Sequence, residues 1–234
     1  MRTRARRTAI SGVHQRISGW TRVNCVSASP DDRWRGTSSD ERAGERCERL
    51  LAACHDIVGT EGVSALAVRA VCRAANVSPR HFYESFADVD ELLLATYERA
   101  VQELLDAIGA AAGAPGGDFA DRLRTVFAVA AGYLESHPES GRIIFREALT
   151  NDVLRTRAVI TLPAFLGAVR QMALEPGRPR AATPYRHLEA TLLSGGLAAA
   201  FVEWLSGSGK FTRDQLVSYC TTATLTLLST ALPS

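Results

Sequence analysis

Residues 66–83 read LAVRAVCRAANVSPRHFY, and this stretch predicts two short helices separated by a tight turn. The apolar residues of its first half recur at helical spacing: Leu66, Val68, Val71, Cys72 and Ala75. Asn76 tolerates the left-handed backbone that ends a helix, Ser78 is a preferred N-cap, and Pro79 fits the first position of the next helix. A helix, a tight turn and a second helix form the helix-turn-helix of many DNA-binding domains, whose second helix enters the major groove.

The helical pattern continues on both sides of this stretch. A helix is predicted before it, because Ser38 stands three residues ahead of Glu41 as in a capping box and an apolar stripe follows up to Gly62. Beyond it, helical periodicity predicts six further segments, at residues 88–108, 119–136, 138–149, 151–174, 184–206 and 212–231. Capping-box pairs open two of them, Asp88 with Glu91 and Thr212 with Gln215. Pro163 predicts a kink in one helix, and the glycine-rich run 109–117 predicts a loop.

These patterns predict an all-α protein of about nine helices, because no run of strict two-residue alternation bounded by hairpin turns competes with them. A chain of 234 residues exceeds the usual size of one domain, so a small domain followed by a larger one is expected. The expected regions are a basic arm (1–38), a three-helix helix-turn-helix domain (39–87), a connecting helix (88–108) and a larger helical domain (109–234).

Basic residues gather at the start of the chain and in the helix-turn-helix stretch. Residues 1–40 hold eight arginines against three aspartates, although the whole chain carries a net charge of only +2. Residues 62–83 contain no acidic residue, so DNA phosphates would meet no carboxylate there. A basic arm suggests a nucleic-acid partner, with a solvated tail as the alternative.

The stretch from Gly62 to Leu92, GVSALAVRAVCRAANVSPRHFYESFADVDEL, resembles the N-terminal domain of the TetR family of transcriptional regulators. The resemblance is carried by the spacing of Val71, Cys72, Ala75, Asn76, Val77, Ser78, Phe82, Tyr83, Phe86 and Leu92. It covers residues 41–108 by motif and residues 109–234 by helix order and length. It implies three helices for DNA and the others for dimerisation and ligand binding. Ala67 and Val89 replace a hydroxyl residue and a lysine of the family pattern, which shifts phosphate binding toward the basic arm.

By this resemblance, the second helix of the motif is the recognition helix, and Tyr83 holds the position of a tyrosine that touches phosphate. The predicted DNA contacts are Arg69, Arg73, Ser78, Pro79, Arg80, His81 and Tyr83. Arg80 can donate a bidentate pair of hydrogen bonds to guanine, and the hydroxyl and imidazole groups can bond to phosphates or base edges. Structural alternatives stay open for five of these residues. Ser78 and Pro79 can serve only to start the helix. Tyr83 can pack in the core, and Arg69 and Arg73 can be ordinary surface charges.

The rest of the chain is predicted to hold a ligand cavity and a dimer interface. Aromatic side chains on its helices are the candidate ligand contacts, with ordinary core packing as the alternative: Tyr97, Phe127, Tyr133, Phe145, Phe165 and Trp204. The helix 184–206 mixes small and large residues, which permits close helix approach: Leu188, Leu192, Gly195, Gly196, Ala199 and Trp204. Together with the last helix, this composition predicts a homodimer with a four-helix interface.

We therefore expect a DNA-binding transcriptional regulator, a repressor that a small apolar or aromatic effector releases from a double-stranded DNA operator. The alternative is an all-helical interaction or scaffold protein without specific DNA binding. No cofactor, metal site or enzymatic activity is expected, because the catalytic motifs G-x-S-x-G, H-E-x-x-H and G-x-G-x-x-G are absent and the histidines are scattered. The GSGK run at 207–210 lacks the first glycine and the hydroxyl residue of a phosphate-binding loop.

The sequence also predicts a cytoplasmic protein. Its apolar stretches fall short of the ~20 residues that a membrane span needs, and the arginines of residues 2–7 are not followed by the apolar region of a signal peptide. A transit peptide over residues 1–30 is the alternative. The five cysteines are odd in number and form no C-x-x-C pair, which favours small core residues over a disulfide framework or a zinc site.

Overall fold

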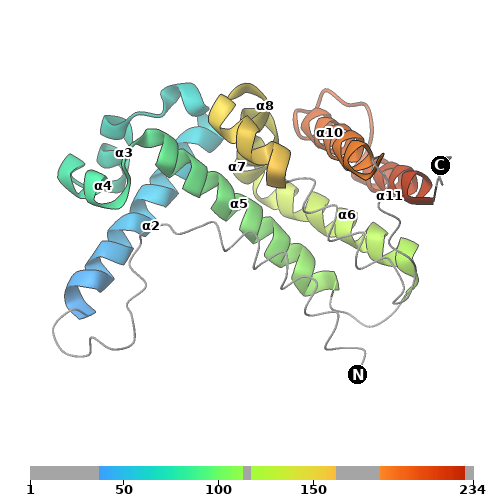
Figure 1. The fold of residues 1–234 in the computed structure, drawn as a ribbon, viewed down its shortest axis with the longest axis horizontal. Helices are drawn as coiled ribbons and strands as arrows, with labels where there is room; N and C mark the ends of the chain where they lie inside the picture. Colours follow the sequence, from blue (N-terminus) through green and yellow to red (C-terminus); the bar gives the residue numbers. More distant parts are fainter. Residues whose placement is uncertain (1–36, 113–116, 162–184, 230–234) are drawn as a thin grey trace.

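The computed structural model describes residues 37–112, 117–161 and 185–229, and every regular element within these ranges is helical (Figure 1). The first elements are α2 (Thr37–Thr60), η1 (Val63–Ala65), α3 (Val68–Ala75), α4 (Pro79–Ser85) and α5 (Val89–Ala112). They are followed by α6 (Phe119–Ser136), α7 (Pro138–Gly141), η2 (Arg142–Glu147), α8 (Ala148–Thr150) and a helix over 152–161. The last are α10 (Tyr185–Leu205) and α11 (Arg213–Ser229). The predicted all-α fold is confirmed.

Helices α2, α3 and α4 pack against one another around a small apolar core. Leu50 and Val58 of α2, Val71 of α3, and Phe82 of α4 are fully buried, and Phe86 beyond α4 is nearly so. These side chains lie one or two helical turns apart, so a single face of each helix turns inward.

Helix α5 joins this cluster to the rest of the molecule. It packs against α2 and also against α6 and η2, whereas α6 contacts α11 and α10 contacts both α11 and η2. In Figure 1, α3 and α4 lie at one end of the molecule and α10 and α11 lie side by side at the other. Among the described elements, the main contacts that connect the α10 end to α3 and α4 run through α5 or the α7–η2 segment and then through α2.

Several predicted boundaries hold, and two are wrong. Thr212 and Gln215 form the predicted reciprocal cap, with N···O distances of 2.8 Å and 3.3 Å. Helix α2 begins at Thr37, so Ser38 lies inside its first turn and is not its N-cap. Helix α5 runs to Ala112 and shortens the predicted loop 109–117, because the alanines after Gly109 are the best helix formers. Pro163 and Phe165 lie outside the described residues.

The helix predicted over 138–149 is interrupted by a different helical geometry. Its middle half, Arg142–Glu147, is the π-helical element η2, with α7 before it and α8 after it. A π-turn is rare and often marks a functional position in a helix. It brings Ile143 and Ile144 into the core while Arg142 and Glu147 reach toward the end of α2.

All four described cysteines are buried, as the sequence predicts, and three of them are free. Cys54, Cys72 and Cys220 are free and buried, and burial raises the pKa of the Cys54 thiol to about 11. Because a thiol with that pKa stays protonated at neutral pH, Cys54 is a core residue rather than a redox sensor. Cys47 is buried but disulfide-bonded, which the odd number of cysteines did not predict. None of the described helices combines the length and the apolar composition that crossing a membrane requires.

Candidate nucleic-acid interface and internal cavity

The turn between α3 and α4 has the geometry that its sequence predicts. Asn76 adopts the left-handed conformation, with φ 52° and ψ 48°, and the Val77 N–H donates to the Cys72 carbonyl at 3.0 Å. Val77 is buried, and Arg49 of α2 donates through Nη1 to the Asn76 carbonyl oxygen at 3.5 Å. The turn is therefore held by its own backbone and by α2, so α3 and α4 keep a defined angle.

Helix α4 opens as predicted and presents polar side chains to solvent. The Ser78 Oγ accepts from the His81 N–H at 3.3 Å, and Pro79 occupies the first turn. Phe82 faces the core, while Tyr83 is 60% exposed and its ring meets Phe82 edge to face, with centroids 5.3 Å apart. Arg80 is also exposed, so α4 offers a guanidinium, an imidazole and a phenol on its outer surface.

The remaining predicted DNA contacts lie on α3. Arg69 and Arg73 are both exposed on that helix. Ala67 is the N-cap residue of α3 and supplies no side-chain hydrogen bond there. The seven residues that the sequence singled out thus lie on two consecutive helices and the turn that joins them, and their contacts with DNA stay predictions.

Glu84 of α4 is not among the predicted DNA contacts, but it pairs with two of them. Glu84 Oε1 accepts from Arg80 Nε at 3.2 Å, and Glu84 Oε2 lies 3.9 Å from His81 Nε2. The spacing of three and four residues along one helix is a signal that could have predicted both pairs. The contact of Arg49 with the turn has no comparable signal, because it joins residues of two separate helices.

A group of polar contacts holds the end of α2 to η2, and we call it the η2 clamp: Thr60, Val63, Arg142 and Glu147. Arg142 Nε donates to Glu147 Oε1 at 3.1 Å, and Arg142 Nη1 donates to the Thr60 carbonyl at 2.6 Å. The other carboxylate oxygen of Glu147 accepts from the Val63 N–H at 3.1 Å. Gly62 between them has φ 92°, and a Cβ there would lie 3.0 Å from Arg142 Nη2. The backbone just before α3 is therefore fixed by side chains of η2.

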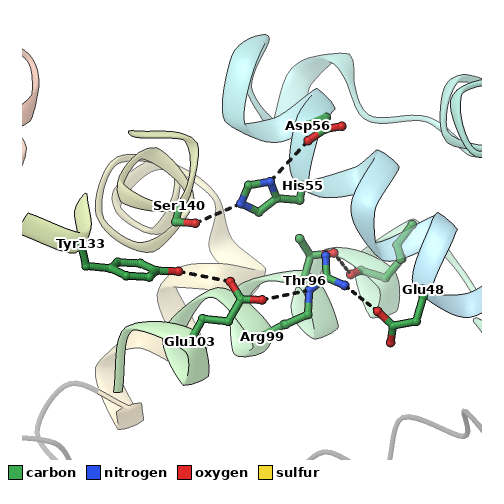
Figure 2. Close-up of polar contacts among 9 residues, drawn as sticks. Glu48, His55, Asp56, Thr96, Arg99, Glu103, Tyr133 and Ser140 are labelled. Atoms are coloured by element: carbon green, nitrogen blue, oxygen red, sulfur yellow. Dashed lines mark hydrogen bonds and ion pairs between the residues drawn. The ribbon is translucent and has the colours of Figure 1, made fainter. Parts of the chain in front are cut away.

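Further polar contacts join α2 to its neighbours, as Figure 2 shows. His55 Nε2 lies 3.0 Å from Ser140 Oγ of α7. A second chain of contacts runs from α6 to α2, and its steps are Tyr133 to Glu103 at 3.2 Å, Glu103 to Arg99 at 3.9 Å, and Arg99 to Glu48 at 3.2 Å. These contacts add directional links to the apolar packing between α2, α5, α6 and α7.

An internal apolar cavity of about 70 Å³ lies between α5, α6, η2, the helix 152–161 and α10. Of the predicted ligand contacts, Tyr97, Phe127 and Phe145 line it. Trp204 does not line it but packs edge-on against Phe201, which does. Tyr133 faces an open groove of about 600 Å³ along α6 instead. The cavity is smaller than the ~300–1,000 Å³ of ligand pockets, so a ligand needs its walls to move.

The polar groups in the cavity wall already have partners. The Thr161 hydroxyl donates to the Arg157 carbonyl and the Ser194 hydroxyl to the Thr191 carbonyl, each at 3.0 Å. Next to the wall, Arg157 forms a buried ion pair with Glu98 of α5, and burial raises the pKa of Glu98 although the arginine opposes it. No buried side-chain nitrogen or oxygen among the described residues lacks a hydrogen bond. The cavity therefore offers apolar surface and little capacity for further hydrogen bonds.

Among the described residues, no group of three or more His, Cys, Asp or Glu side chains is placed to hold a metal ion. The described residues also form an exposed polar surface on α3 and α4 and an apolar cavity next to η2.

Comparisons with known proteins agree with this arrangement. The profile of the family described as "Bacterial regulatory proteins, tetR family" matches residues 50–96. A TetR-family transcriptional regulator from Rhodococcus sp. superposes with a TM-score of 0.62 at 20% identity, covering 79% of this chain and all of that one. The fatty acid degradation regulator FadR from Bacillus halodurans gives 0.60 at 15% identity, covering 77% and 94%. The multidrug binding protein EbrR, complexed with imidazole, gives 0.59 at 20% identity, covering 81% and 97%. No curated protein sequence matches the chain significantly.

Proposed function

We propose that the chain is a member of the TetR family of bacterial regulatory proteins, whose profile matches residues 50–96, and that it is a repressor that a small apolar or aromatic ligand releases from its DNA operator. The family is described as bacterial regulatory proteins, so we propose regulation through DNA binding rather than catalysis. Because a bacterial DNA-binding regulator must reach the chromosome, we propose a cytoplasmic location.

The proposed DNA interface is the outer surface of α3, the turn and α4. Arg80 reads a guanine, Ser78, His81 and Tyr83 bond to phosphate or base edges, and the arginines of α3 neutralise backbone phosphates. The exposure of Arg69, Arg73, Ser78, Arg80 and Tyr83, with Phe82 as the buried residue of α4, supports this assignment. The basic arm of residues 1–36 adds affinity that does not depend on sequence.

One observation carries the proposal that a ligand controls DNA binding: η2 touches both the cavity and the segment from the end of α2 to η1, which leads directly into α3. Ile144 and Phe145 of η2 line the cavity, whereas Arg142 and Glu147 of the same element form the η2 clamp. A ligand that enlarges the cavity displaces Ile144 and Phe145. Because these residues share η2 with Arg142 and Glu147, the clamp contacts shift as well. The π-helical geometry of η2 is rare, and its conversion to α-helix would turn the clamp residues relative to α2.

The descriptions of two structural relatives support an apolar effector. One is a multidrug binding protein, and another is a regulator of fatty acid degradation. The satisfied hydroxyls of the cavity wall also favour a ligand that is recognised by shape and apolar contact.

We further propose that the active form is a homodimer. Leu188 and Leu192 of α10 and Tyr219 of α11 are more than half exposed, and a Cβ added at Gly195 or Gly196 would meet no atom within 4 Å. Large exposed apolar residues, next to glycines with unfilled space around them, fit an interface between two copies of α10 and α11. Two copies would place two recognition helices on half-sites one helical turn apart, so that small changes in their separation change the affinity.

The test uses the full-length protein and a duplex that it selects from a random DNA library. Medium-chain alkanols, alkylphenols and polycyclic aromatic compounds are screened for thermal stabilisation, and each hit is then titrated into the protein–DNA complex. At least one hit is expected to weaken DNA binding by roughly 5- to 150-fold, the usual range of such coupling. Ligands of several classes that stabilise the protein without changing DNA affinity would indicate a constitutive DNA binder. Failure of the protein to select any duplex would favour a helical scaffold.

The role of the clamp is tested by Glu147→Gln. The amide oxygen can still accept from the Val63 N–H, but the ion pair with Arg142 is lost. Ligand-induced stabilisation should persist while the effect of the ligand on DNA affinity shrinks. Asp152→Asn is the matched control, because it removes an exposed ion pair with Arg155 away from the clamp.

A further inference from the structure

Helix α4 carries a single acidic residue, Glu84, which is exposed next to Arg80 and His81. Under the proposed function, this helix approaches the DNA phosphates. A carboxylate there is repelled by the phosphates, so Glu84 lowers affinity for every duplex in the same way. Its presence is explained if it improves the choice between sequences.

The two oxygens of Glu84 face two different basic side chains. Oε1 accepts from Arg80 Nε at 3.2 Å, and Oε2 lies 3.9 Å from His81 Nε2. The other ring nitrogen of His81 lies 2.9 Å from Ser78 Oγ, which itself accepts from the His81 backbone N–H. Since Ser78 Oγ accepts one hydrogen bond, its own proton can be donated to Nδ1, which leaves the proton of a neutral ring on Nε2, toward Glu84. Ser78, His81, Glu84 and Arg80 thus form one connected chain.

We propose that Glu84 is a positioning residue that sets the orientation in which Arg80 reads a guanine, an inference that rests on the proposed DNA interface. A guanidinium has five N–H donors in a fixed plane. With Nε held by Glu84, the two terminal nitrogens form the free edge of that plane. This edge has the geometry of a bidentate pair to guanine O6 and N7. An arginine that is held in this way discriminates better than one that moves freely, because fewer of its orientations also suit a phosphate or another base.

The experiment measures base preference rather than affinity alone. The full-length protein, Glu84→Ala, Glu84→Gln, Arg80→Ala and the double variant Arg80→Ala/Glu84→Ala each select duplexes from a random library. The selected site and its single-base variants are then titrated by competition at several salt concentrations. Glu135→Gln is the matched control, because it removes the carboxylate of another exposed ion pair, with Arg213 at the same distance of 3.2 Å on other helices.

The expected result is specific to one base pair. Glu84→Ala should reduce the preference for guanine at the position that Arg80→Ala also relaxes, by about two- to fivefold, as expected for an exposed ion pair. The affinity of Glu84→Ala for an unrelated duplex should rise, because the variant lacks the carboxylate that the DNA phosphates repel. Glu84→Gln should retain most of the preference, since its amide oxygen still accepts from Nε. The double variant should lose no more preference than Arg80→Ala alone.

Three results would overturn the proposal. Glu84→Ala could relax a position that Arg80→Ala leaves intact, which would make Glu84 a direct reader of a base such as cytosine. It could change affinity equally at every site, like a simple surface charge. If the unsubstituted protein selects no site at all, the proposed DNA-binding function fails together with this inference. Circular dichroism of each variant shows whether the helices are intact.

Discussion

At the scale of single residues, the substitution Tyr83→Phe tests whether the Tyr83 hydroxyl contacts a DNA phosphate, as proposed, or a base. Its hydroxyl is free to meet a phosphate, because the residue is 60% exposed while its ring packs on Phe82. Tyr83→Phe keeps that packing and removes one neutral hydrogen bond, which is worth about 0.5–1.5 kcal/mol. Affinity for selected and unrelated duplexes should fall by the same factor, with the preferred site unchanged. A change of preferred site in a binding selection would show that the hydroxyl contacts a base.

Asn76 gives a prediction about stability at the same scale. A residue with a Cβ pays about 1–2 kcal/mol in the left-handed region, and asparagine is the side chain that tolerates it best after glycine. Asn76→Ala should therefore lower the free energy of unfolding by about 1 kcal/mol, whereas Asn76→Gly should leave it unchanged or slightly higher. The hydrogen bond from Arg49 persists in both, since it is accepted by the backbone. Urea denaturation followed by far-UV circular dichroism measures the difference, and equal midpoints for the two variants would contradict it.

The residues of the turn could be predicted from the sequence because their roles depend on neighbours in the chain. Asn76, Ser78 and Pro79 each satisfy a backbone requirement within a few residues, so composition and spacing suffice. The η2 clamp could not be predicted in this way. Glu147 binds the Val63 N–H, which is 84 positions away in the chain, and only the packed fold brings the two together.

At the scale of elements, the contact between α2 and α7 is close enough to be tested by adding one methyl group. A Cβ at Gly59 would lie 2.4 Å from Cβ of Glu139, so the two helices must separate to accept Gly59→Ala. Overpacking of this kind destabilises by about 1–3 kcal/mol. Because His55–Ser140 and the η2 clamp flank the contact, we also expect a change in DNA affinity.

Gly44 of the same helix supplies the matched control for this prediction. A Cβ there would meet nothing within 4 Å, so Gly44→Ala only replaces a poor helix former by the best one. It should raise the free energy of unfolding by about 0.5–1 kcal/mol. The midpoints of thermal or chemical unfolding should therefore shift in opposite directions, downward for Gly59→Ala and upward for Gly44→Ala. A shift in the same direction would mean that α2 and α7 are not tightly packed at Gly59.

Helices were the elements most open to prediction, because apolar periodicity depends on each segment alone. The periodic stripes of α5, α6 and α11 placed these helices within a few residues of their observed bounds. The π-helical geometry of η2 was missed, since RIIFRE is equally compatible with an α-helix. Which geometry it adopts is decided by its contacts with the cavity wall on one side and with α2 on the other.

At the scale of the whole molecule, the cavity and the proposed dimer interface depend on how distant helices meet. The sequence indicated aromatic residues that line the cavity, such as Tyr97 and Phe145, but it could not separate them from Tyr133, which faces outward. Aromatic periodicity shows that a side chain is on a helix face, and the packing of neighbouring helices decides which face is enclosed. For α10 as well, the sequence shows that Leu188 and Leu192 are apolar, but only the packed structure shows that they are exposed in the single chain.

Leu192 offers the sharpest test of the homodimer. A leucine buried in an interface contributes about 1.5–3 kcal/mol, and a two-fold interface contains it twice, so Leu192→Asp removes both contributions and adds two charges. We expect the dissociation constant of the dimer to rise by roughly a hundredfold or more. Sedimentation velocity at low micromolar concentration should then show a monomer. DNA affinity should fall with it, because one recognition helix reaches only one half-site.

Val159→Asp is the control, because Val159 is also a large exposed apolar residue but lies on the helix 152–161 rather than on α10 or α11. It introduces the same charge and should leave both the dimer and DNA binding intact. Since both positions are exposed in the single chain, neither substitution should lower the helical content measured by circular dichroism. If Leu192→Asp remains a dimer while Val159→Asp becomes a monomer, the interface lies on the helix 152–161 and not on α10. Two recognition helices would then be held at a different separation, and the spacing of the selected half-sites would report it.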